Sequence, residues 1–485
     1  MRSQGISRRA FLQKGALGAA ALALPAAVWP AASDAGSRRR PNVLFILTDQ
    51  QRADMLSCAG NPYLKTPAMD SLAENGARFE LAYCAHPLCI PSRTSMLTGV
   101  MPSRAEWEIK EGKRRNTPAD LLPGSLGVVF RNAGYETAYG GKTHVPMTIE
   151  QAGFDYVSKD TRSELAQTCA DFLRQKHERP FLLAASFINP HDICSMAITA
   201  CKRAQNGESG AVDPKSLPGG LQLPEGATWP AFVEEQCPPL PANFEIPKGE
   251  PESVREVDPR PFRFFVREHW TESDWRLHRW AYCRLTEKVD SEIGVVLQAL
   301  RAAGLEEDTL VVFSSDHGDL DASHRLEHKS VLYEEAMRVP FLVSWKGVTR
   351  PGLVDNEHFV STGLDLIPTL CDFAGIPAPE GRAGRSVRPL AEGRRPDSWR
   401  ENLVAESRHS RALRTVRYKY TVYDAGEARE ALVDLRDDPG EMRNLARDPN
   451  SSSVLESHRA SLRRAMEESD DPLADQFAIR LEKTK

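Results

Sequence analysis

The chain lacks several features that mark particular protein classes. Its nine cysteines include no C-x-x-C pair, which argues against a zinc site of the usual spacing. The formal net charge is −5, and no strongly basic domain stands out, so a nucleic-acid-binding function is a poor expectation. There is also no internal repeat and no long low-complexity run. The chain must therefore be interpreted motif by motif.

Length and composition are those of an ordinary soluble protein. The 485 residues can bury a large core, and 41% of them are hydrophobic and 27% charged. We expect one large domain and one smaller domain. For the cysteines two options stay open, disulfides in an oxidising compartment or buried free thiols, because connectivity cannot be deduced from sequence.

The N-terminus resembles a twin-arginine export signal. Ser7-Arg8-Arg9-Ala10-Phe11-Leu12 precedes an Ala/Leu-rich run from Gly15 to Val28. This run is too short and too rich in alanine for a strong transmembrane segment, so residues 1–33 are expected to be a cleaved signal peptide, with a membrane anchor as the alternative. The resemblance implies the twin-arginine translocase as a partner, no membrane span in the mature protein, and a location in the bacterial periplasm or outside the cell.

Four apolar runs predict strands, and each run ends in polar residues. Helical patterns lie between them, which predicts a mostly parallel sheet with helices on both faces. Because ligands bind beyond the carboxyl ends of strands in such sheets, we expect the four polar clusters to converge. The runs and their polar ends are Asn42–Thr48 with Asp49-Gln50, Tyr135–Tyr139 with Lys142 and His144, Phe181–Phe187 with His191, and Leu310–Phe313 with Asp316-His317.

The regular alternation breaks twice along the chain. Residues 195–263 are rich in proline and glycine and too long for a plain loop, so we expect an insert that lines the substrate pocket, with a disordered tether as the alternative. From about Pro396, short strands and turns precede a predicted helix over Ser453–Glu468. This pattern favours a small antiparallel α+β subdomain at 396–485, beside a main domain at 41–395.

Cys89 opens the stretch Cys-Ile-Pro-Ser-Arg-Thr-Ser-Met-Leu-Thr-Gly. Pro91 suits the first position of a helix and Gly99 suits the residue after its end, so a helix is predicted over Pro91–Thr98. Cys89 then lies just ahead of the helix N-terminus, where free N–H groups and the dipole favour an anion, and Arg93 can point the same way. We interpret Cys89 as a nucleophile.

This stretch also carries a family resemblance. C-x-P-S-R followed by T-x-x-x-x-G resembles the signature of the type I, formylglycine-dependent sulfatases, and the segments 417–420 and 438–445 resemble the C-terminal part of that family. The resemblance implies an alkaline phosphatase-like α/β fold: a large mixed, mostly parallel sheet sandwiched by helices, with a smaller C-terminal α+β subdomain that has an antiparallel sheet. It also implies that a formylglycine-generating enzyme oxidises Cys89 to 3-oxoalanine.

A divalent metal site is expected where two of the strands end. Two carboxylates, an amide oxygen and an imidazole can together hold a divalent cation. The implied ion is calcium, but a histidine ligand is atypical for so hard a cation and leaves magnesium or a transition metal open. Taken singly, each aspartate is also a plausible helix cap. With the modified position 89, the expected ligands are Asp49, Gln50, Cys89, Asp316 and His317.

The resemblance assigns catalytic roles residue by residue. The hydrated aldehyde at position 89 attacks sulfur, two lysines grip the sulfate, and one arginine steadies the nucleophile. One histidine takes a proton during elimination of sulfate, and another protonates the departing alcohol. The nucleophile is at Cys89, the lysines are Lys142 and Lys329, and the arginine is Arg93. His144 takes the proton during elimination, and His191 protonates the departing alcohol.

Two further histidines are candidate substrate contacts. The segment from Asp319 to His328 has no glycine, unlike the glycine-rich loop usual in the family, so either His324 or His328 is expected to add to the substrate contacts of Lys142, His191 and Lys329. With only two negative metal ligands, the pocket should be net positive and receptive to a dianion.

The expected function is that of an exported sulfatase acting on sulfate monoesters. The long insert and the export signal favour O-sulfate on carbohydrate as the substrate. Aryl or choline sulfate is an alternative, and phosphonate monoesters or phosphodiesters are another, because these tetrahedral esters are hard to tell apart by sequence. A non-catalytic glycan-binding relative is the alternative outside enzymes.

Overall fold

The computed structural model describes residues 40–105, 109–110, 113–114, 116–229, 231–256 and 261–479. These residues belong to one compact unit that begins at Arg40. The predicted signal peptide at 1–33 lies outside the described residues. No helix within the described ranges is both long enough and apolar enough to cross a membrane.

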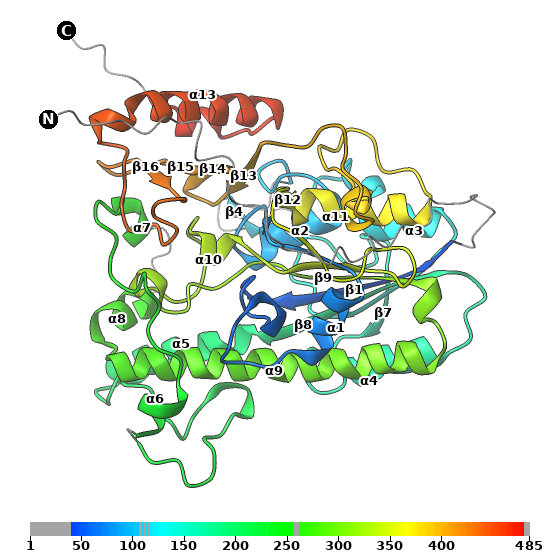
Figure 1. Cartoon of the computed structure of the whole chain (residues 1–485), viewed down its shortest axis with the longest axis horizontal. Helices are drawn as coiled ribbons and strands as arrows, with labels where there is room; N and C mark the ends of the chain where they lie inside the picture. The colour runs from blue at the N-terminus through cyan, green and yellow to red at the C-terminus, as the bar shows by residue number, and fades with distance from the viewer. Residues whose placement is uncertain are drawn as a thin grey trace, which may run out of the picture. The chain divides into compact units, whose positions relative to one another are not determined.

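An eight-stranded mixed sheet lies at the centre of this unit, in the order β11-β2-β10-β9-β1-β8-β6-β7 (Figure 1). The four strands predicted from sequence, β9, β1, β8 and β6, are direct neighbours and run parallel. β10 runs antiparallel to β9, which makes the sheet mixed. The strands are β1 (Asn42–Asp49), β2 (Ala77–Phe79), β6 (Glu136–Gly141), β7 (Asp155–Ser158), β8 (Phe181–Pro190), β9 (Thr309–Ser315), β10 (Phe341–Ser344) and β11 (Leu353–Asp355).

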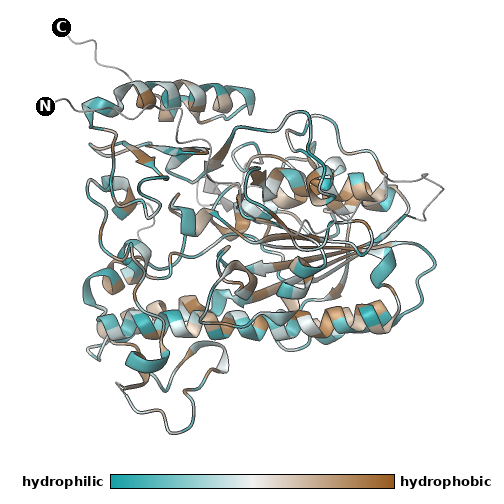
Figure 2. Cartoon of the chain, viewed as in Figure 1, coloured by the Kyte–Doolittle hydropathy of each residue, from teal (hydrophilic) through white to brown (hydrophobic). Residues whose placement is uncertain are grey.

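Strand β1 shows why the apolar runs form the middle of the sheet. Its side chains alternate between two hydrophobic cores, with Val43, Phe45 and Leu47 in one and Leu44 and Ile46 in the other. A strand covered on both faces needs apolar residues at every position, which is the pattern seen in the sequence. Figure 2 shows the central strands largely in brown, the colour of hydrophobic residues.

Helices cover both faces of the sheet, as predicted. One core contains residues of α2 (Cys89–Thr98), α3 (Leu126–Asn132), α11 (Thr362–Ala374) and α12 (Arg388–Ala391). The other contains residues of α1 (Pro67–Glu74), α4 (Leu165–Arg174) and α9 (Glu272–Ala302). The helix predicted over Pro91–Thr98 begins two residues earlier, at Cys89, because Leu88 is the last extended residue, and it ends at Gly99 with φ of 70°.

The described residues of the insert are largely helical. They form α5 (Cys194–Gln205), α6 (Ala231–Gln236), α7 (Glu252–Glu256) and α8 (Pro261–His269). Apolar side chains of α5, α6 and α8 pack with the N-terminal half of α9 in a third hydrophobic core. The insert is thus attached to the longest helix of the molecule.

The C-terminal part forms an antiparallel sheet with one helix packed on it, which together with the central sheet confirms the predicted fold class. The sheet order is β13-β14-β15-β16, and α13 shares a core with β14, β15 and β16. The elements are β13 (Asn402–Glu406), β14 (Ser410–Thr415), β15 (Tyr418–Tyr423), β16 (Glu430–Asp434) and α13 (Ser452–Glu468). The remaining short elements are β3 (Ala82–Tyr83), β4 (Ile109–Lys110), β5 (Lys113–Arg114), β12 (Val360–Ser361) and α10 (Glu334–Met337).

Candidate active site

Four neighbouring strands deliver polar residues to one edge of the sheet. Asp49 ends β1, Lys142 follows β6, His191 follows β8, and Asp316 follows β9. Since these strands are parallel and adjacent, their carboxyl ends meet, and the predicted convergence is observed. Cys89, at the N-terminus of α2, lies at the same place, with its Sγ 3.7 Å from Asp49 Oδ1.

Asp49, Cys89, Asp316 and His317 form a buried cluster whose ligand atoms all lie within 4.8 Å of one another. Nδ1 of His317 donates to the carbonyl oxygen of Gly318 at 2.9 Å, which leaves Nε2 facing Cys89 Sγ at 3.2 Å. Two carboxylates and a correctly oriented imidazole are a donor set that fits a divalent cation. Burial and the neighbouring Asp49 charge raise the pKa of Asp316 to about 6, so a cation here would relieve the repulsion.

Arg93 donates hydrogen bonds to both carboxylates of this cluster. Its Nε donates to Asp316 Oδ2 at 2.7 Å and its Nη2 to Asp49 Oδ2 at 2.9 Å. Its Nη1 donates to the carbonyl of Lys142 and to Ser186 Oγ. The guanidinium therefore ties together residues from β1, β6, β8 and β9, and its buried position agrees with a fixed rather than a mobile cation.

Two lysines approach the cysteine from different elements. Lys142 Nζ lies 2.6 Å from Asp49 Oδ2 and 3.8 Å from Cys89 Sγ, and Lys329 Nζ lies 3.4 Å from the same sulfur. Burial and Asp49 oppose the thiolate, but Lys329, His317 and Lys142 outweigh them and hold the pKa of Cys89 well below its usual range. The site thus favours negative charge at position 89.

Gln50 links the cluster to the loop that follows β9. Its backbone N–H donates to Asp316 Oδ1 at 3.1 Å, and its amide oxygen accepts a hydrogen bond from Lys329 Nζ at 2.5 Å. Its amide nitrogen donates to Asp319 Oδ2 at 2.5 Å. Gln50 is therefore next to the cluster, with its amide engaged by other partners, and its role as a metal ligand stays a prediction.

His191 and His144 occupy different environments. His191 is half-buried beside the cluster, and its pKa is lowered, first by burial and then by Lys329, while Asp49 and Cys89 partly offset the shift. His144 lies in the loop after β6 with an exposed side chain, and it makes no hydrogen bond or ion pair with another described residue. Their catalytic roles stay predictions.

His324 and His328 are buried away from the reacting cysteine. His324 stacks on Tyr333 with ring centroids 3.8 Å apart, and its Nε2 lies 3.6 Å from Glu335 Oε2. His328 Nδ1 lies 2.9 Å from Cys194 Sγ, behind the Gln50 amide. These two histidines are not among the residues that contact Cys89, and the expectation that one of them adds a substrate contact stays a prediction.

Sequence reasoning missed several residues that support the site. Asp319 and Cys194 contact the Gln50 amide, and the hydroxyl of Tyr282 donates to the Gln50 carbonyl at 2.5 Å. Ser186 contacts Arg93 at 2.7 Å. Ser186 and Asp319 lie in or next to the predicted strand ends, so position in the strand was a usable signal for them. Tyr282 comes from the middle of α9, where nothing in the sequence distinguishes it.

The backbone around the site is unusually constrained. Among the described non-glycine residues with positive φ, eight of ten lie in the segments that carry the site. Such conformations cost free energy for residues with a Cβ and concentrate at functional sites. These eight residues are Gln50, His144, Asp321, Ala322, His324, Arg325, His328 and Ser330.

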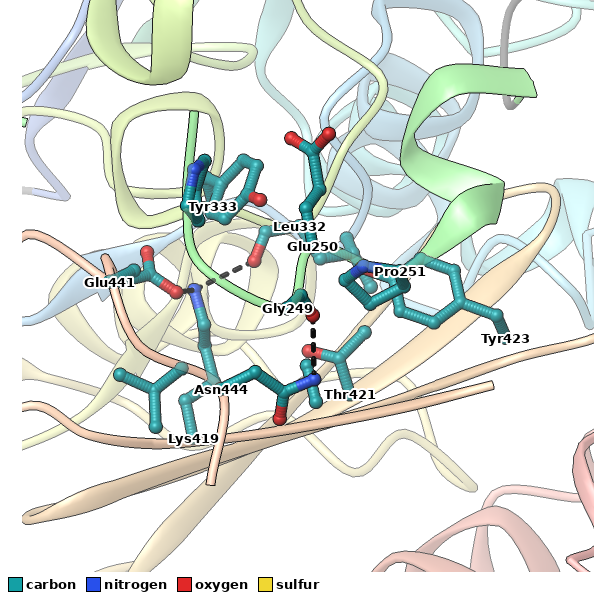
Figure 3. A pocket seen from close by; sticks show the side chains of 13 residues that line it. Gly249, Glu250, Pro251, Leu332, Tyr333, Lys419, Thr421, Tyr423, Glu441 and Asn444 are labelled. Atoms are coloured by element: carbon teal, nitrogen blue, oxygen red, sulfur yellow. Dashed lines mark hydrogen bonds and ion pairs between the residues drawn. The ribbon is translucent and has the colours of Figure 1, made fainter. Parts of the chain in front are cut away.

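A separate small pocket lies where the insert meets the C-terminal sheet (Figure 3). Lys419 donates to the Leu332 carbonyl at 2.7 Å and pairs with Glu441, while Asn444 donates to the Gly249 carbonyl at 3.0 Å. With a volume of about 20 Å³, it has room for about one water molecule. These contacts hold the insert, the loop after β9 and the C-terminal sheet together, and they contain none of the residues around Cys89.

Comparison with known proteins places the chain in a family. Residues 41–376 match the sulfatase family, and residues 322–468 match the C-terminal region of N-sulphoglucosamine sulphohydrolase. The chain is 31% identical over 456 residues to a Delta 4,5-hexuronate-2-O-sulfatase of Bacteroides thetaiotaomicron, with 88% of this chain and 89% of that protein covered.

Solved structures agree with this assignment. A 2-O GAG sulfatase superposes with a TM-score of 0.78 at 28% identity, over 92% of this chain and 95% of that one. A phosphonate monoester hydrolase of Agrobacterium radiobacter superposes with a TM-score of 0.67 at 21% identity, over 89% and 96% of the two chains, a likeness of fold alone. The chain therefore belongs to the sulfatase family and is a sulfuric ester hydrolase.

Proposed function

We propose that this sulfatase hydrolyses O-sulfate esters on acidic carbohydrate of the glycosaminoglycan type, with a formylglycine at position 89 and a divalent metal ion. The observation that carries the proposal is the geometry around Cys89. Its sulfur lies at a helix N-terminus, 3.2 Å from His317 Nε2 and 3.4 Å from Lys329 Nζ, beside two buried carboxylates. Such a site holds a metal on one side of position 89 and an anionic group on the other.

The charges of the site support a dianionic substrate group. Arg93, Lys142 and Lys329 bring three positive charges, and Asp49 and Asp316 bring two negative ones. These charges are already net positive, and a divalent ion held by Asp49, Asp316 and His317, with Gln50 as a further ligand, would make the site more positive. That ion would supply Lewis-acid stabilisation of negative charge. Calcium is the proposed ion, and magnesium is the alternative.

Each remaining residue has a task that its position allows. Lys142 and Lys329 bind the sulfate oxygens, because both ammonium groups lie within 4 Å of the position-89 sulfur. Arg93 holds Asp49 and Asp316 in place. His191, half-buried beside the cluster, gives a proton to the departing alcohol oxygen, and His144, exposed at the end of β6, takes the proton from position 89 when sulfate leaves.

The choice of sugar rests on the relatives. The proteins most informative here are described as a Delta 4,5-hexuronate-2-O-sulfatase and a 2-O GAG sulfatase. We therefore propose 2-O-sulfate on a uronic acid residue as the bond cleaved. We also propose export through the twin-arginine pathway, to the periplasm or beyond, after cytoplasmic conversion of Cys89.

The test combines a mass measurement with an activity panel. Protein produced together with a formylglycine-generating enzyme is digested. The mass of its peptide carrying Cys89 is compared with the mass of the same peptide from protein produced without that enzyme. We expect a loss of about 18 mass units and hydrolysis of a 2-O-sulfated unsaturated uronate disaccharide. A phosphonate monoester cleaved faster than any sulfate ester would instead assign the enzyme to the phosphonate hydrolases, and an unmodified but active Cys89 would exclude the formylglycine mechanism.

A further inference from the structure

A second cavity, of about 270 Å³, opens at the opposite end of α2 from Cys89. Its walls come from the end of α2 and the turn after it, from the loop before α12, and from the C-terminal end of α13. Figure 1 shows α13 at the top of the view, above the C-terminal sheet. Since α2 has ten residues, the cavity lies about 15 Å along the helix from the reacting position. It is separate from the site described above.

Two arginines line this cavity without a carboxylate partner. Neither Arg104 nor Arg382 makes an ion pair with another residue of the described ranges, and the buried Nε of Arg382 has no hydrogen-bond partner there. Burial and then the charge of Arg104 lower the pKa of Arg382, and the charge of the nearby Asp120 only partly offsets this shift. An anion between them would supply the missing partner and remove the repulsion.

The side chain of Arg382 occupies space that is free because position 124 is a glycine. A Cβ at position 124 would lie 2.6 Å from Arg382 Nη2. A Cβ at position 99 would lie 3.5 Å from Arg382 Cδ. Any side chain at position 124 would displace the guanidinium. Gly124, which is distant in sequence, therefore leaves the space that the Arg382 guanidinium occupies.

The other walls have a different chemistry. Glu468, which makes no ion pair within the described ranges, lies at the C-terminal end of α13, where free carbonyls also accept hydrogen bonds. Val100 and Leu364 add apolar surface. A fitting ligand has an anionic group at one end, hydroxyl donors at the other, and an apolar C–H face between them. An acidic sugar residue combines these three features, and the volume is close to the smallest known ligand pockets, about 300 Å³.

We propose that this cavity is a second carbohydrate site, which binds one acidic sugar residue through Arg104 and Arg382 and its hydroxyl groups through Glu468. The site takes a uronate or a sulfated sugar outside the reaction centre. It extends the contact with an acidic polysaccharide beyond the residue that is cleaved. Binding here needs no chemistry at position 89, so it can be tested independently of the proposed function.

Hydrogen exchange of the full chain locates such a ligand. The probe is D-glucuronate, compared with D-glucose as a neutral sugar and sodium sulfate as a bare anion. We expect glucuronate to slow exchange in residues 99–104 and 380–384, whereas glucose does not. Arg382→Gln should raise the half-saturating concentration for this protection at least about tenfold, since a charge-assisted pair is lost.

Two variants complete the design. Arg104→Gln changes an exposed side chain and should weaken protection without threatening the fold, and Arg463→Gln, which removes an exposed arginine of α13 outside the cavity, should leave protection unchanged. No protection by glucuronate, or protection that survives both cavity variants, would overturn the proposal. Equal protection by sulfate and glucuronate at the same concentration would reduce the cavity to a simple anion site and reject its carbohydrate specificity.

Discussion

Two buried clusters in this protein contain side chains of the kinds that bind metal ions. The hydrogen bonds and pKa shifts of these side chains differ between the two clusters. Within the described ranges, the reaction cluster consists of Asp49, Cys89, Asp316 and His317, and the tie cluster consists of His324, Glu335 and Glu441; in each, the ligand atoms lie within 4.8 Å of one another. By composition alone, both could be candidate metal sites.

In the tie cluster both carboxylates have partners outside the cluster. Asn243 Nδ2 donates to Glu335 Oε1 at 2.6 Å, and Glu441 accepts from the Glu334 N–H at 2.7 Å and pairs with Lys419. Burial opposes ionisation of Glu335, but His324 and Arg52 outweigh it and lower its pKa. Glu335 accepts a hydrogen bond at Oε1, and its Oε2 lies 3.6 Å from His324 Nε2 as an ion pair without a hydrogen bond, so this carboxylate ties the loop after β9 to α10 and the C-terminal turn.

In the reaction cluster the pKa values of the two carboxylates are shifted in opposite directions. Asp49 takes both Arg93 and Lys142 and its pKa is lowered despite burial, whereas the pKa of Asp316 is raised to about 6 by burial and by Asp49. Nε2 of His317 faces Cys89 Sγ at 3.2 Å. The difference teaches that the state of the donors, and not their list, distinguishes a metal site from a structural ion-pair network.

The largest expected effect comes from Cys89→Ala. It removes the nucleophile of the reaction cluster, and we expect turnover of sulfate esters to fall by about 10⁵-fold, as for other nucleophile deletions. Initial rates on a 2-O-sulfated disaccharide measure this change. Cys283→Ala, which changes a buried thiol of α9, is the control and should retain most of the activity. Comparable losses in the two variants would show that Cys89 has no special role.

Removal of a histidine from each cluster separates the two most directly. His317→Ala should lower kcat/KM by about 10³-fold and weaken metal binding, because metal stabilisation of charge is worth several kcal/mol. His324→Ala should leave kcat nearly unchanged and cost about 1–3 kcal/mol of unfolding free energy. Activity assays before and after chelation, with calorimetric metal titration, measure the first effect, and urea unfolding measures the second. Metal loss in His324→Ala would contradict the distinction.

His191→Ala tests the side of the reaction cluster that faces the leaving group. We expect about 10²-fold slower hydrolysis of alkyl sulfates, and little change with an activated aryl sulfate whose leaving group needs no proton. Parallel kcat/KM measurements with the two ester types show the difference. Equal losses with both would assign His191 to sulfate binding instead.

The smallest predicted effect is the pH dependence of the unfolding free energy that Glu335 of the tie cluster contributes. Because the pKa of Glu335 is depressed in the folded state, its contribution to stability is present above the ordinary glutamate pKa and is lost as pH falls towards the folded value. Glu335→Gln should therefore be about 1–3 kcal/mol less stable than the parent chain at pH 7, with a gap that narrows below about pH 4. Urea unfolding at several pH values measures the gap, with the surface variant Glu306→Gln as control. A gap that widens in acid would refute the assignment.

The sequence alone determined the fold class and most of the reaction cluster. Apolar runs such as 42–48 have to be buried on both faces of a sheet. Adjacent parallel strands bring the residues at their carboxyl ends to one edge, so the proximity of Asp49, Lys142 and Asp316 could be predicted from the sequence. The C-x-P-S-R motif added Cys89 and Arg93 through family resemblance. The helix boundaries were predicted to within a few residues, because Pro91 and Gly99 carry local conformational preferences.

Only the tertiary structure decided which buried polar residues are reactive and which are structural. The sequence does not distinguish His317 from His324, and they differ because His317 directs Nε2 at Cys89, whereas His324 stacks on Tyr333 beside the carboxylate of Glu335. Tyr282, Asp319 and Cys194 meet Gln50 through packing between distant segments, and Arg104 meets Arg382 in the same way. Local patterns set strands and helices, whereas the partner of a charged side chain depends on long-range contacts that no local pattern encodes.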